Sequence, residues 1–436
     1  MRLKTLTSKK FLGVIISSLV LFWYIYTPNI IYFPISIDKP LLIGFFSWAL
    51  LWHRHELIWL LSQREVFFIL TIYLIIFIYT FALDLLIIDG IGISYNVVLY
   101  SIQYIPFTIL LFIYMNSIFG EECLDKLFKI LLYLIFFQTI LGLIMFINPL
   151  FKTAVYSIQA QDGSIYQGLG LITRGNGYAS GLLFSVPIIH GIVAATLMLS
   201  RVSISTFTKT VFVFFVIAMA ITNARMALVP IIIAMPFLAF RFFSPAGFIA
   251  NSKGLMVAAL LIILISILTP ANMISDDIYI GVSHIVDRLI SGYANVLGIE
   301  INGNQDRIGE YLLYESTYVD NSLLALLFGT GEYAFTSSAN QSDIGIINLI
   351  RFGGFLYLAA ALFVTYYLII KAWSMTSNPT FKILILLLGI TYFAASLKGI
   401  VFTEQILSRF FVLICLFVIL DRIRYRSRRH DNVLIS

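Results

Sequence analysis

The chain has 436 residues, of which 60% are hydrophobic and only 11% are charged, with a formal net charge of +6 at pH 7. Its mean hydropathy is +0.96. One water-soluble core cannot hide this much apolar surface, so the composition excludes a soluble globular protein. Apolar runs of about 17–25 residues recur along the sequence, which is the length that a helix needs to cross a bilayer. We therefore expect an all-α, polytopic membrane protein.

About twelve apolar runs are predicted to be transmembrane helices. The first has no small-residue cleavage site after it, so it is interpreted as a retained helix rather than a cleaved signal. The second is interrupted by Asp38, Lys39 and Pro40, and only a few residues around Asn223–Met226 separate two short spans. The predicted spans are 11–27, 35–52, 66–86, 97–117, 127–147, 177–199, 210–223, 226–242, 254–270, 343–370, 381–397 and 402–421.

The distribution of Lys and Arg predicts the orientation, because basic residues are retained on the cytoplasmic side. With the N-terminus inside, inner segments hold eighteen basic residues and outer segments hold seven, so both termini are expected in the cytoplasm. The outer seven are Lys39, Lys152, Arg174, Arg225, Arg288, Arg307 and Lys398. The inner eighteen are Arg2, Lys4, Lys9, Lys10, Arg54, Arg64, Lys126, Arg201, Lys209, Arg241, Lys253, Lys371, Lys382, Arg422, Arg424, Arg426, Arg428 and Arg429.

The polar sequence outside the spans is concentrated in one large outer loop. Four regions follow: 1–270 with nine spans, the loop 271–342, 343–421 with three spans, and a basic cytoplasmic tail at 422–436. With its boundary residue Asp343, the loop carries ten acids and two bases. Its leucines predict amphipathic helices over the membrane mouth. The tail directly follows a helix, so it is interpreted as a topological anchor that touches anionic lipid, and no nucleic-acid partner is expected.

Motifs of soluble enzymes are absent, so no cofactor and no metal are expected. There is no P-loop, and the five histidines show no HExxH spacing. His53 and His55 form a possible metal pair, but a solvated inner loop is the favoured interpretation. Cys123 falls in an inner loop and Cys415 inside the last span, so the two cannot form a disulfide on this topology.

Outward-facing arginines are the most informative residues. Arg225 follows Asn223 in a tight outer turn, where it either snorkels to the interface or binds an anion beside helix ends. Its planar guanidinium can bind phosphate oxygens bidentately. Arg174 precedes Gly175 and Gly177 at the start of the next span, so free backbone amides can join it around a phosphate.

Further candidates lie in and after the large loop. Arg307 stands between Asp306 and Glu310, and its alternative role is a surface ion pair. Asp343 begins a predicted helix, so it is either a general base or an N-cap. Arg351 is one of the few charges placed deep in the predicted spans, together with Lys129 and Arg409.

The order of these features resembles the O-antigen polymerase and O-antigen ligase superfamily of bacterial polysaccharide assembly. The resemblance spans residues 165–420, and the earlier helices match only in hydropathy. It rests on Arg174, Thr222-Asn-Ala-Arg225, Asp306-Arg307, Leu327-Phe-Gly-Thr-Gly331, Ser342-Asp343 and Leu349-Ile-Arg-Phe-Gly-Gly354. The ligase branch typically has His-Asn where this chain has Ser342-Asp343, which favours a polymerase of the Wzy type.

The resemblance implies the substrate, the partners and the roles of the residues. The substrate would be an oligosaccharide repeat unit on undecaprenyl diphosphate at the outer leaflet of the bacterial inner membrane, and a flippase and a chain-length regulator would be partners. Positioned arginines would stabilise the leaving diphosphate without a metal. The implied catalytic residues are Arg225, Arg307, Asp343 and Glu310, and the implied substrate-binding residues are Arg174, Gly175, Gly177, Asn223, Gly329, Gly331 and Arg351.

Three other functions are alternatives. An O-antigen ligase shares most of the motifs. A lipid-linked oligosaccharide flippase would be expected to keep its charges in a central cavity and to have short outer loops, whereas here the polar residues gather in one outer loop. A secondary transporter would be expected to show broken helices in related halves, and the sequence has no such symmetry.

Overall fold

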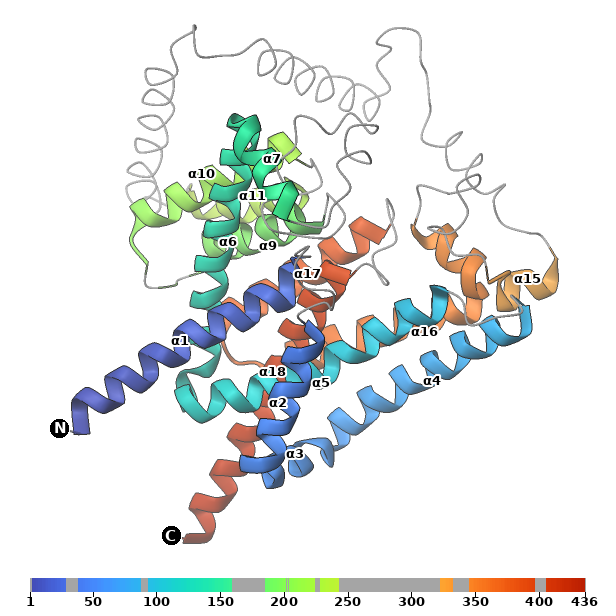
Figure 1. The fold of residues 1–436 in the computed structure, drawn as a ribbon, viewed down its shortest axis with the longest axis horizontal. Coiled ribbons are helices and arrows are strands. Elements are labelled where there is room, and N and C mark those ends of the chain that lie inside the picture. Colours follow the sequence, from blue (N-terminus) through green and yellow to red (C-terminus); the bar gives the residue numbers. More distant parts are fainter. Residues whose placement is uncertain are drawn as a thin grey trace, which may run out of the picture.

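The computed structural model describes residues 2–28, 38–87, 93–158, 185–200, 202, 204–223, 228–242, 322–331, 345–396 and 405–435. Within these ranges every regular element is a helix and no strand occurs, which confirms the all-α expectation. Figure 1 shows long helices crossing one another, with both ends of the chain toward the lower left of the view.

The helices of the first half of the chain are mostly long and apolar. They are α1 (Arg2–Tyr26), α2 (Asp38–Trp52), α3 (Arg54–Leu61), α4 (Arg64–Ile87), α5 (Ile93–Phe119), the 3-10 turn η1 (Gly120–Glu122), α6 (Cys123–Ile147) and α7 (Pro149–Ile158).

The second half continues in the same way. Its described helices are α9 (Ser185–Leu199), α10 (Thr206–Asn223), α11 (Val229–Phe242), α15 (Leu323–Phe328), α16 (Gly345–Met375), α17 (Pro379–Ser396) and α18 (Gln405–Ile435).

Eleven of the twelve predicted spans contain a described helix, and the remaining one, 254–270, lies outside the described residues. Four stretches are long and apolar enough to cross a membrane by length and composition: Arg64–Leu83, Gln103–Met145, Ile346–Met375 and Pro379–Ser396. The second of these includes most of α5, the turn η1 and α6. Lys10–Tyr26, Lys39–Trp52, Ser185–Leu199 and Thr206–Ala220 are shorter apolar helices.

Proline and asparagine mark several helix starts. Pro40 lies in the first turn of α2, where its missing N–H needs no intrahelical partner, so the expected interruption is the helix start itself. Asn148 caps α7, since its Oδ1 accepts a hydrogen bond from the amide of Phe151 at 3.0 Å. Asn378 caps α17 in the same way through the amide of Thr380 at 3.0 Å.

The core of the bundle is built around α18. Every residue from 406 to 420 is buried, so this helix carries no lipid-facing stripe along that stretch. It packs closely on α5, where the rings of Phe112 and Phe417 meet edge to face at 5.1 Å. In contrast, α4 exposes Phe67, Ile75 and Ile78. Such a helix with large exposed apolar side chains requires an apolar surrounding.

Three segments differ from the simple picture of spans and loops. Helix α3 lies in the predicted inner loop after the second span, and α7 lies at the start of the predicted outer loop 148–176. The basic tail continues α18 as one helix to Ile435. In the part of the large loop that the structure describes, α15 covers four of the leucines that predicted amphipathic helices, but its sequence LLALLF is apolar on all sides.

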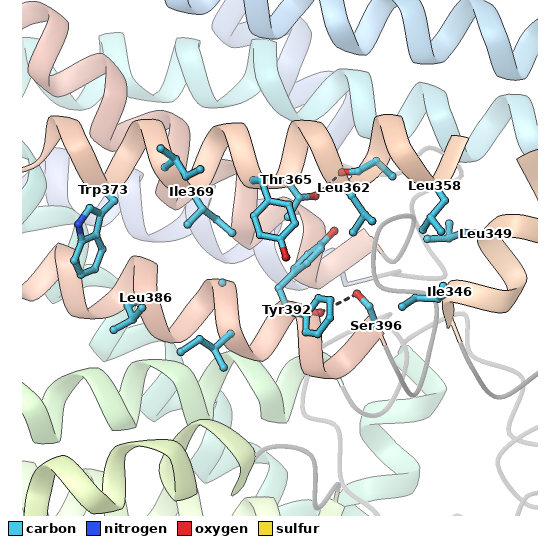
Figure 2. A pocket seen from close by; sticks show the side chains of 16 residues that line it. Ile346, Leu349, Leu358, Leu362, Thr365, Ile369, Trp373, Leu386, Tyr392 and Ser396 are labelled. Carbon is cyan, nitrogen blue, oxygen red and sulfur yellow. Dashed lines mark hydrogen bonds between the residues drawn. The ribbon is translucent and has the colours of Figure 1, made fainter. Parts of the chain in front are cut away.

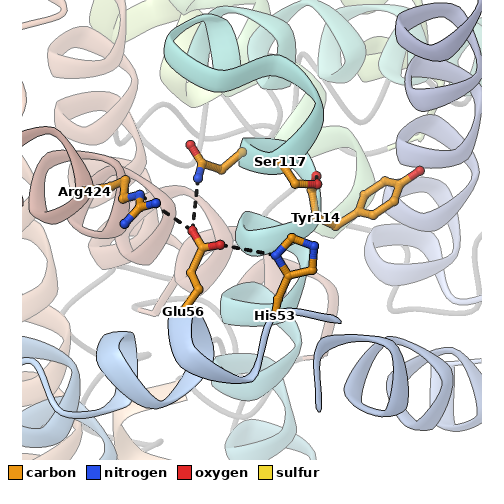
Figure 3. A network of polar contacts seen from close by, with 6 residues as sticks. His53, Glu56, Tyr114, Ser117 and Arg424 are labelled. Atoms are coloured by element: carbon orange, nitrogen blue, oxygen red, sulfur yellow. Dashed lines mark hydrogen bonds and ion pairs between the residues drawn. The ribbon is translucent and has the colours of Figure 1, made fainter. Parts of the chain in front are cut away.

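Polar contacts join several residues that were predicted to be cytoplasmic. The Glu56 carboxylate lies 3.4 Å from Nδ1 of His53 and 3.7 Å from Nε of Arg424, and it accepts a hydrogen bond from Asn116 at 3.1 Å (Figure 3). Thus α3, α5 and α18 meet at one carboxylate.

Two further contacts join α4 to α16 and α6 to the residue that precedes α17. Lys371 forms an ion pair of 3.2 Å with Glu65, and Asn378 donates to Asp125 at 3.4 Å. Contacts between these segments are expected if the basic loops share one side of the membrane.

Candidate functional site

Two of the glycine-rich motifs, which are 20 or more residues apart in the chain, lie against each other. The segment Gly329–Gly331 follows α15, and Arg351–Gly354 lies in the first part of α16. The amide of Thr330 donates to the carbonyl of Arg351 at 2.7 Å, and its hydroxyl donates to the same carbonyl at 3.0 Å. The amide of Gly331 donates to the carbonyl of Phe352 at 3.0 Å. We call this contact the glycine junction.

Glycine is required at the junction because the two backbones touch. Gly329 ends α15 with φ +80°, and a Cβ there would lie 2.6 Å from the amide nitrogen of Gly353. Gly354 interrupts α16 with φ +68° and ψ −173°, a conformation that is essentially restricted to glycine. A Cβ on Gly354 would overlap the carbonyl of Leu327. The interruption separates a short first segment of α16 from the long second one.

A tyrosine of α4 forms hydrogen bonds to both sides of the glycine junction. The Tyr79 hydroxyl of α4 lies 2.8 Å from the carbonyl oxygen of Gly353 and 3.1 Å from that of Phe328. Its single proton serves both carbonyls, which belong to the two sides of the junction. The Tyr79 ring also lies 6.4 Å from the ring of Tyr357, nearly parallel to it. Sequence reasoning missed Tyr79, because one tyrosine in an apolar helix carries no distinguishing signal.

The junction accounts for three of the predicted site residues, Gly329, Gly331 and Arg351. Arg351 is half-buried at the point where α16 receives the Thr330 hydrogen bonds. Asn223 is the last residue of α10. The other candidates, Arg174, Gly175, Gly177, Arg225, Arg307, Glu310 and Asp343, lie outside the described residues.

A buried cation lies elsewhere in the bundle. Arg409 of α18 is only 2% exposed, and its Nη1 donates to the carbonyl of Tyr24 at 3.2 Å. Its guanidinium carbon is 4.9 Å from the centre of the Tyr104 ring, a cation–π distance. The Tyr24 hydroxyl donates to the carbonyl of Tyr104 at 3.2 Å and lies 3.3 Å from the hydroxyl of Thr108. An arginine within an apolar span was the sequence signal for this group, and such residues mark functional sites in membrane proteins.

A buried histidine of α9 joins two other helices, α1 and α6. His190 of α9 is 1% exposed, and its two ring nitrogens lie 3.0 Å from the Tyr26 hydroxyl and 3.0 Å from the Thr139 hydroxyl. Both ring nitrogens therefore have polar partners inside the bundle, as buried polar groups require. Sequence reasoning assigned His190 no role.

An apolar groove of about 410 Å³ runs between α16 and α17. Figure 2 shows Trp373 at one end and Ile346 with Ser396 at the other. The lining side chains are Ile346, Leu349, Leu358, Ala361, Leu362, Thr365, Tyr366, Ile369, Ile370, Trp373, Leu386, Gly389, Ile390, Tyr392, Phe393 and Ser396. Most are apolar or aromatic, which suits a hydrocarbon chain better than a sugar.

The described histidine, cysteine and acidic side chains are spread over the bundle. In those ranges no three His, Cys, Asp or Glu side chains come close enough to hold a metal ion. Cys123 and Cys415 are both free and buried. Nδ1 of His53 lies 3.4 Å from the Glu56 carboxylate, and the His53 ring lies 4.5 Å from the Trp48 ring at an angle of 39°.

The apolar helices and their exposed faces define a helical membrane protein. Compared with models of known protein families and with curated protein sequences, the chain matches none.

Proposed function

We propose that this chain is a polysaccharide polymerase of the bacterial inner membrane. It joins undecaprenyl-diphosphate-linked oligosaccharide repeat units at the outer face and releases the lipid diphosphate. The observation that supports this proposal most is the glycine junction. Two motifs that carry the family resemblance, Leu327–Gly331 and Leu349–Gly354, are hydrogen-bonded to each other although their sequences are separate.

The junction fits a role in positioning because its hydrogen bonds hold the short first segment of α16, which begins at Gly345. Asp343 precedes Gly345, the first residue of that helix, by two positions in the sequence. Arg351 is fixed at its own carbonyl by Thr330, so its backbone is held within the junction. A cation on a fixed backbone can stabilise developing charge without rearranging during the reaction.

The proposed reaction is a group transfer without a metal. A hydroxyl oxygen of the incoming lipid-linked unit attacks the anomeric carbon of the growing chain, and a new glycosidic bond forms. The bond between that carbon and the diphosphate oxygen breaks, and the electron pair leaves with the diphosphate. Arg174, Arg225, Arg307 and Arg351 stabilise the leaving group, while Asp343 or Glu310 takes the hydroxyl proton.

The proposed orientation has both termini in the cytoplasm and the large loop outside. The contacts of Glu56 with Arg424 and of Glu65 with Lys371 support it, because they join four residues from segments with the basic bias of inner loops. The glycine junction then belongs to the outer half of the protein, where a lipid-linked sugar is accessible.

Substitution of Arg351 tests this proposal. In a strain that lacks the chromosomal gene, we expect Arg351→Ala to abolish polymer and Arg351→Lys to reduce it strongly, because lysine loses the bidentate geometry. Lys126→Ala is the matched control, since Lys126 is paired with Glu122 at 3.7 Å on the opposite, inner side. Polymer length is read on a gel and protein abundance by blot. Full-length polymer from Arg351→Ala at normal abundance would contradict the proposal.

A further inference from the structure

A lysine lies next to one end of the groove between α16 and α17. On α17, Leu386, Ile390 and Phe393 line the groove, and Lys382 lies one turn before Leu386 on the same face. On α16 the lining ends at Trp373. The ammonium group of Lys382 lies 5.9 Å from the centre of the Trp373 ring, so a cation lies beside the last lining residue at that end of the groove.

Lys382 has no carboxylate within ion-pair distance in the described part of the chain. Glu65 is paired with Lys371 at 3.2 Å, and Asp125 accepts a hydrogen bond from the side-chain amide of Asn378. Lys382 forms an ion pair with neither of these acids. It also lies in the first turns of α17, an 18-residue helix, whose N-terminal end adds positive potential.

The rest of the groove is suited to a hydrocarbon chain. Its lining on α16 from Leu358 to Trp373 follows helical spacing, which corresponds to about 22 Å at 1.5 Å per residue. That length is a large part of the roughly 30 Å hydrocarbon layer. Ile370, Ile390 and Phe393 also expose large parts of their side chains, so the groove opens to the apolar surroundings.

We propose that this groove binds one anionic glycerophospholipid, with an acyl chain between α16 and α17 and the phosphate at Lys382 above Trp373. A long apolar groove that ends beside one cation is complementary to a molecule with a long apolar chain and an anionic head. Tryptophan beside lysine is also the side-chain pair expected at the boundary between hydrocarbon and head groups. The head-group end of the site, at Trp373, lies at the opposite end of the groove from Leu349 of the Leu349–Gly354 motif (Figure 2), and the inference does not depend on the proposed polymerase activity.

Lipid binding to the purified full-length protein tests this inference. Native mass spectrometry with added phosphatidylglycerol or phosphatidylcholine gives the affinity for each lipid. We expect a preference for phosphatidylglycerol and about fivefold weaker binding of it by Lys382→Gln, the change expected from one basic residue near a lipid surface. Lys126→Gln is the control for loss of an inner lysine and should bind as the wild type does.

A second pair of variants tests the acyl-chain part of the groove. A Cβ on Gly389 would lie 3.0 Å from Cδ1 of Ile369, so Gly389→Leu fills the groove and should weaken binding of both lipids. Gly44→Leu adds the same side chain where no atom lies within 4 Å of a new Cβ, and should leave binding unchanged. Thermal unfolding of each variant reports whether it is folded. Undecaprenyl phosphate is added to the wild type in a third titration. Equal binding of phosphatidylglycerol and phosphatidylcholine by the wild type, unchanged phosphatidylglycerol binding by Lys382→Gln, or tighter binding of undecaprenyl phosphate than of phosphatidylglycerol would overturn the inference.

Discussion

Replacement of Gly354 by alanine should destabilise the protein through two separate effects at the glycine junction. The conformation at φ +68° and ψ −173° costs a non-glycine residue about 1–3 kcal/mol. The new Cβ also overlaps the carbonyl of Leu327, and forced repacking of a close contact costs about 1–3 kcal/mol more. The free energy of unfolding should therefore fall by about 2–6 kcal/mol, a large share of the 5–15 kcal/mol that is typical of a folded protein.

Two glycines of the same chain separate these effects. Gly120 has φ +57° but no atom within 4 Å of a new Cβ, so Gly120→Ala should cost only the backbone strain of about 1–2 kcal/mol. Gly44 lies inside α2 and is equally open, so Gly44→Ala should be neutral or stabilising by up to about 1 kcal/mol. Thermal and denaturant unfolding in detergent, followed by tryptophan fluorescence, measures all three. If Gly354→Ala loses no more stability than Gly120→Ala, the close contact between α15 and α16 is refuted.

Three other outcomes are expected. Burial lowers the pKa of Lys152 to about 8, so the folded protein disfavours the charged form and the free energy of unfolding should rise between about pH 8 and pH 10.5. Lys152→Met should remove that rise. If the variant and the wild type show the same dependence of stability on pH, the buried position of Lys152 is excluded. Reporter fusions at Gly303 and Gln161 should give periplasmic signals and fusions at Ser62, Ser203 and Ser377 cytoplasmic ones, whereas a cytoplasmic signal at Gly303 would reverse the proposed orientation. Arg307→Ala should nearly abolish polymer at normal protein abundance, and Arg288→Ala should not; equal loss with both would leave Arg307 without a special role.

The positions of the helices were largely predictable, because hydropathy reports the length of an apolar run directly. The ends of the helices were less predictable, since they depend on local capping. The segment Asp38–Pro40 was interpreted as an interruption of a span, but it is the start of α2. The helical continuation of the tail was also not predicted. Its charges indicated an anchor, whereas in the structure Arg424 of this helix lies 3.7 Å from Glu56, a residue from a distant part of the chain.

The glycine junction was predictable only in part, because its contacts join residues that are far apart in the chain. The glycines at 329, 331 and 354 were recognised from short motifs, and the structure brings those motifs together. Tyr79 could not be found, because its role depends on carbonyls that are 249 and 274 positions away in the chain. The Lys382 end of the groove was also missed, since its lysine counted only as an inner charge and its tryptophan as one more apolar residue.

The most direct test of the proposed function is the lipid-linked material that accumulates when the gene is deleted. Loss of polymer should leave single repeat units on undecaprenyl diphosphate at the outer leaflet, and the wild-type chain should restore the polymer. Accumulation at the inner leaflet would instead indicate a flippase. Full-length polymer that remains on its lipid carrier would indicate a ligase. Either of these results would contradict the assignment as a polymerase.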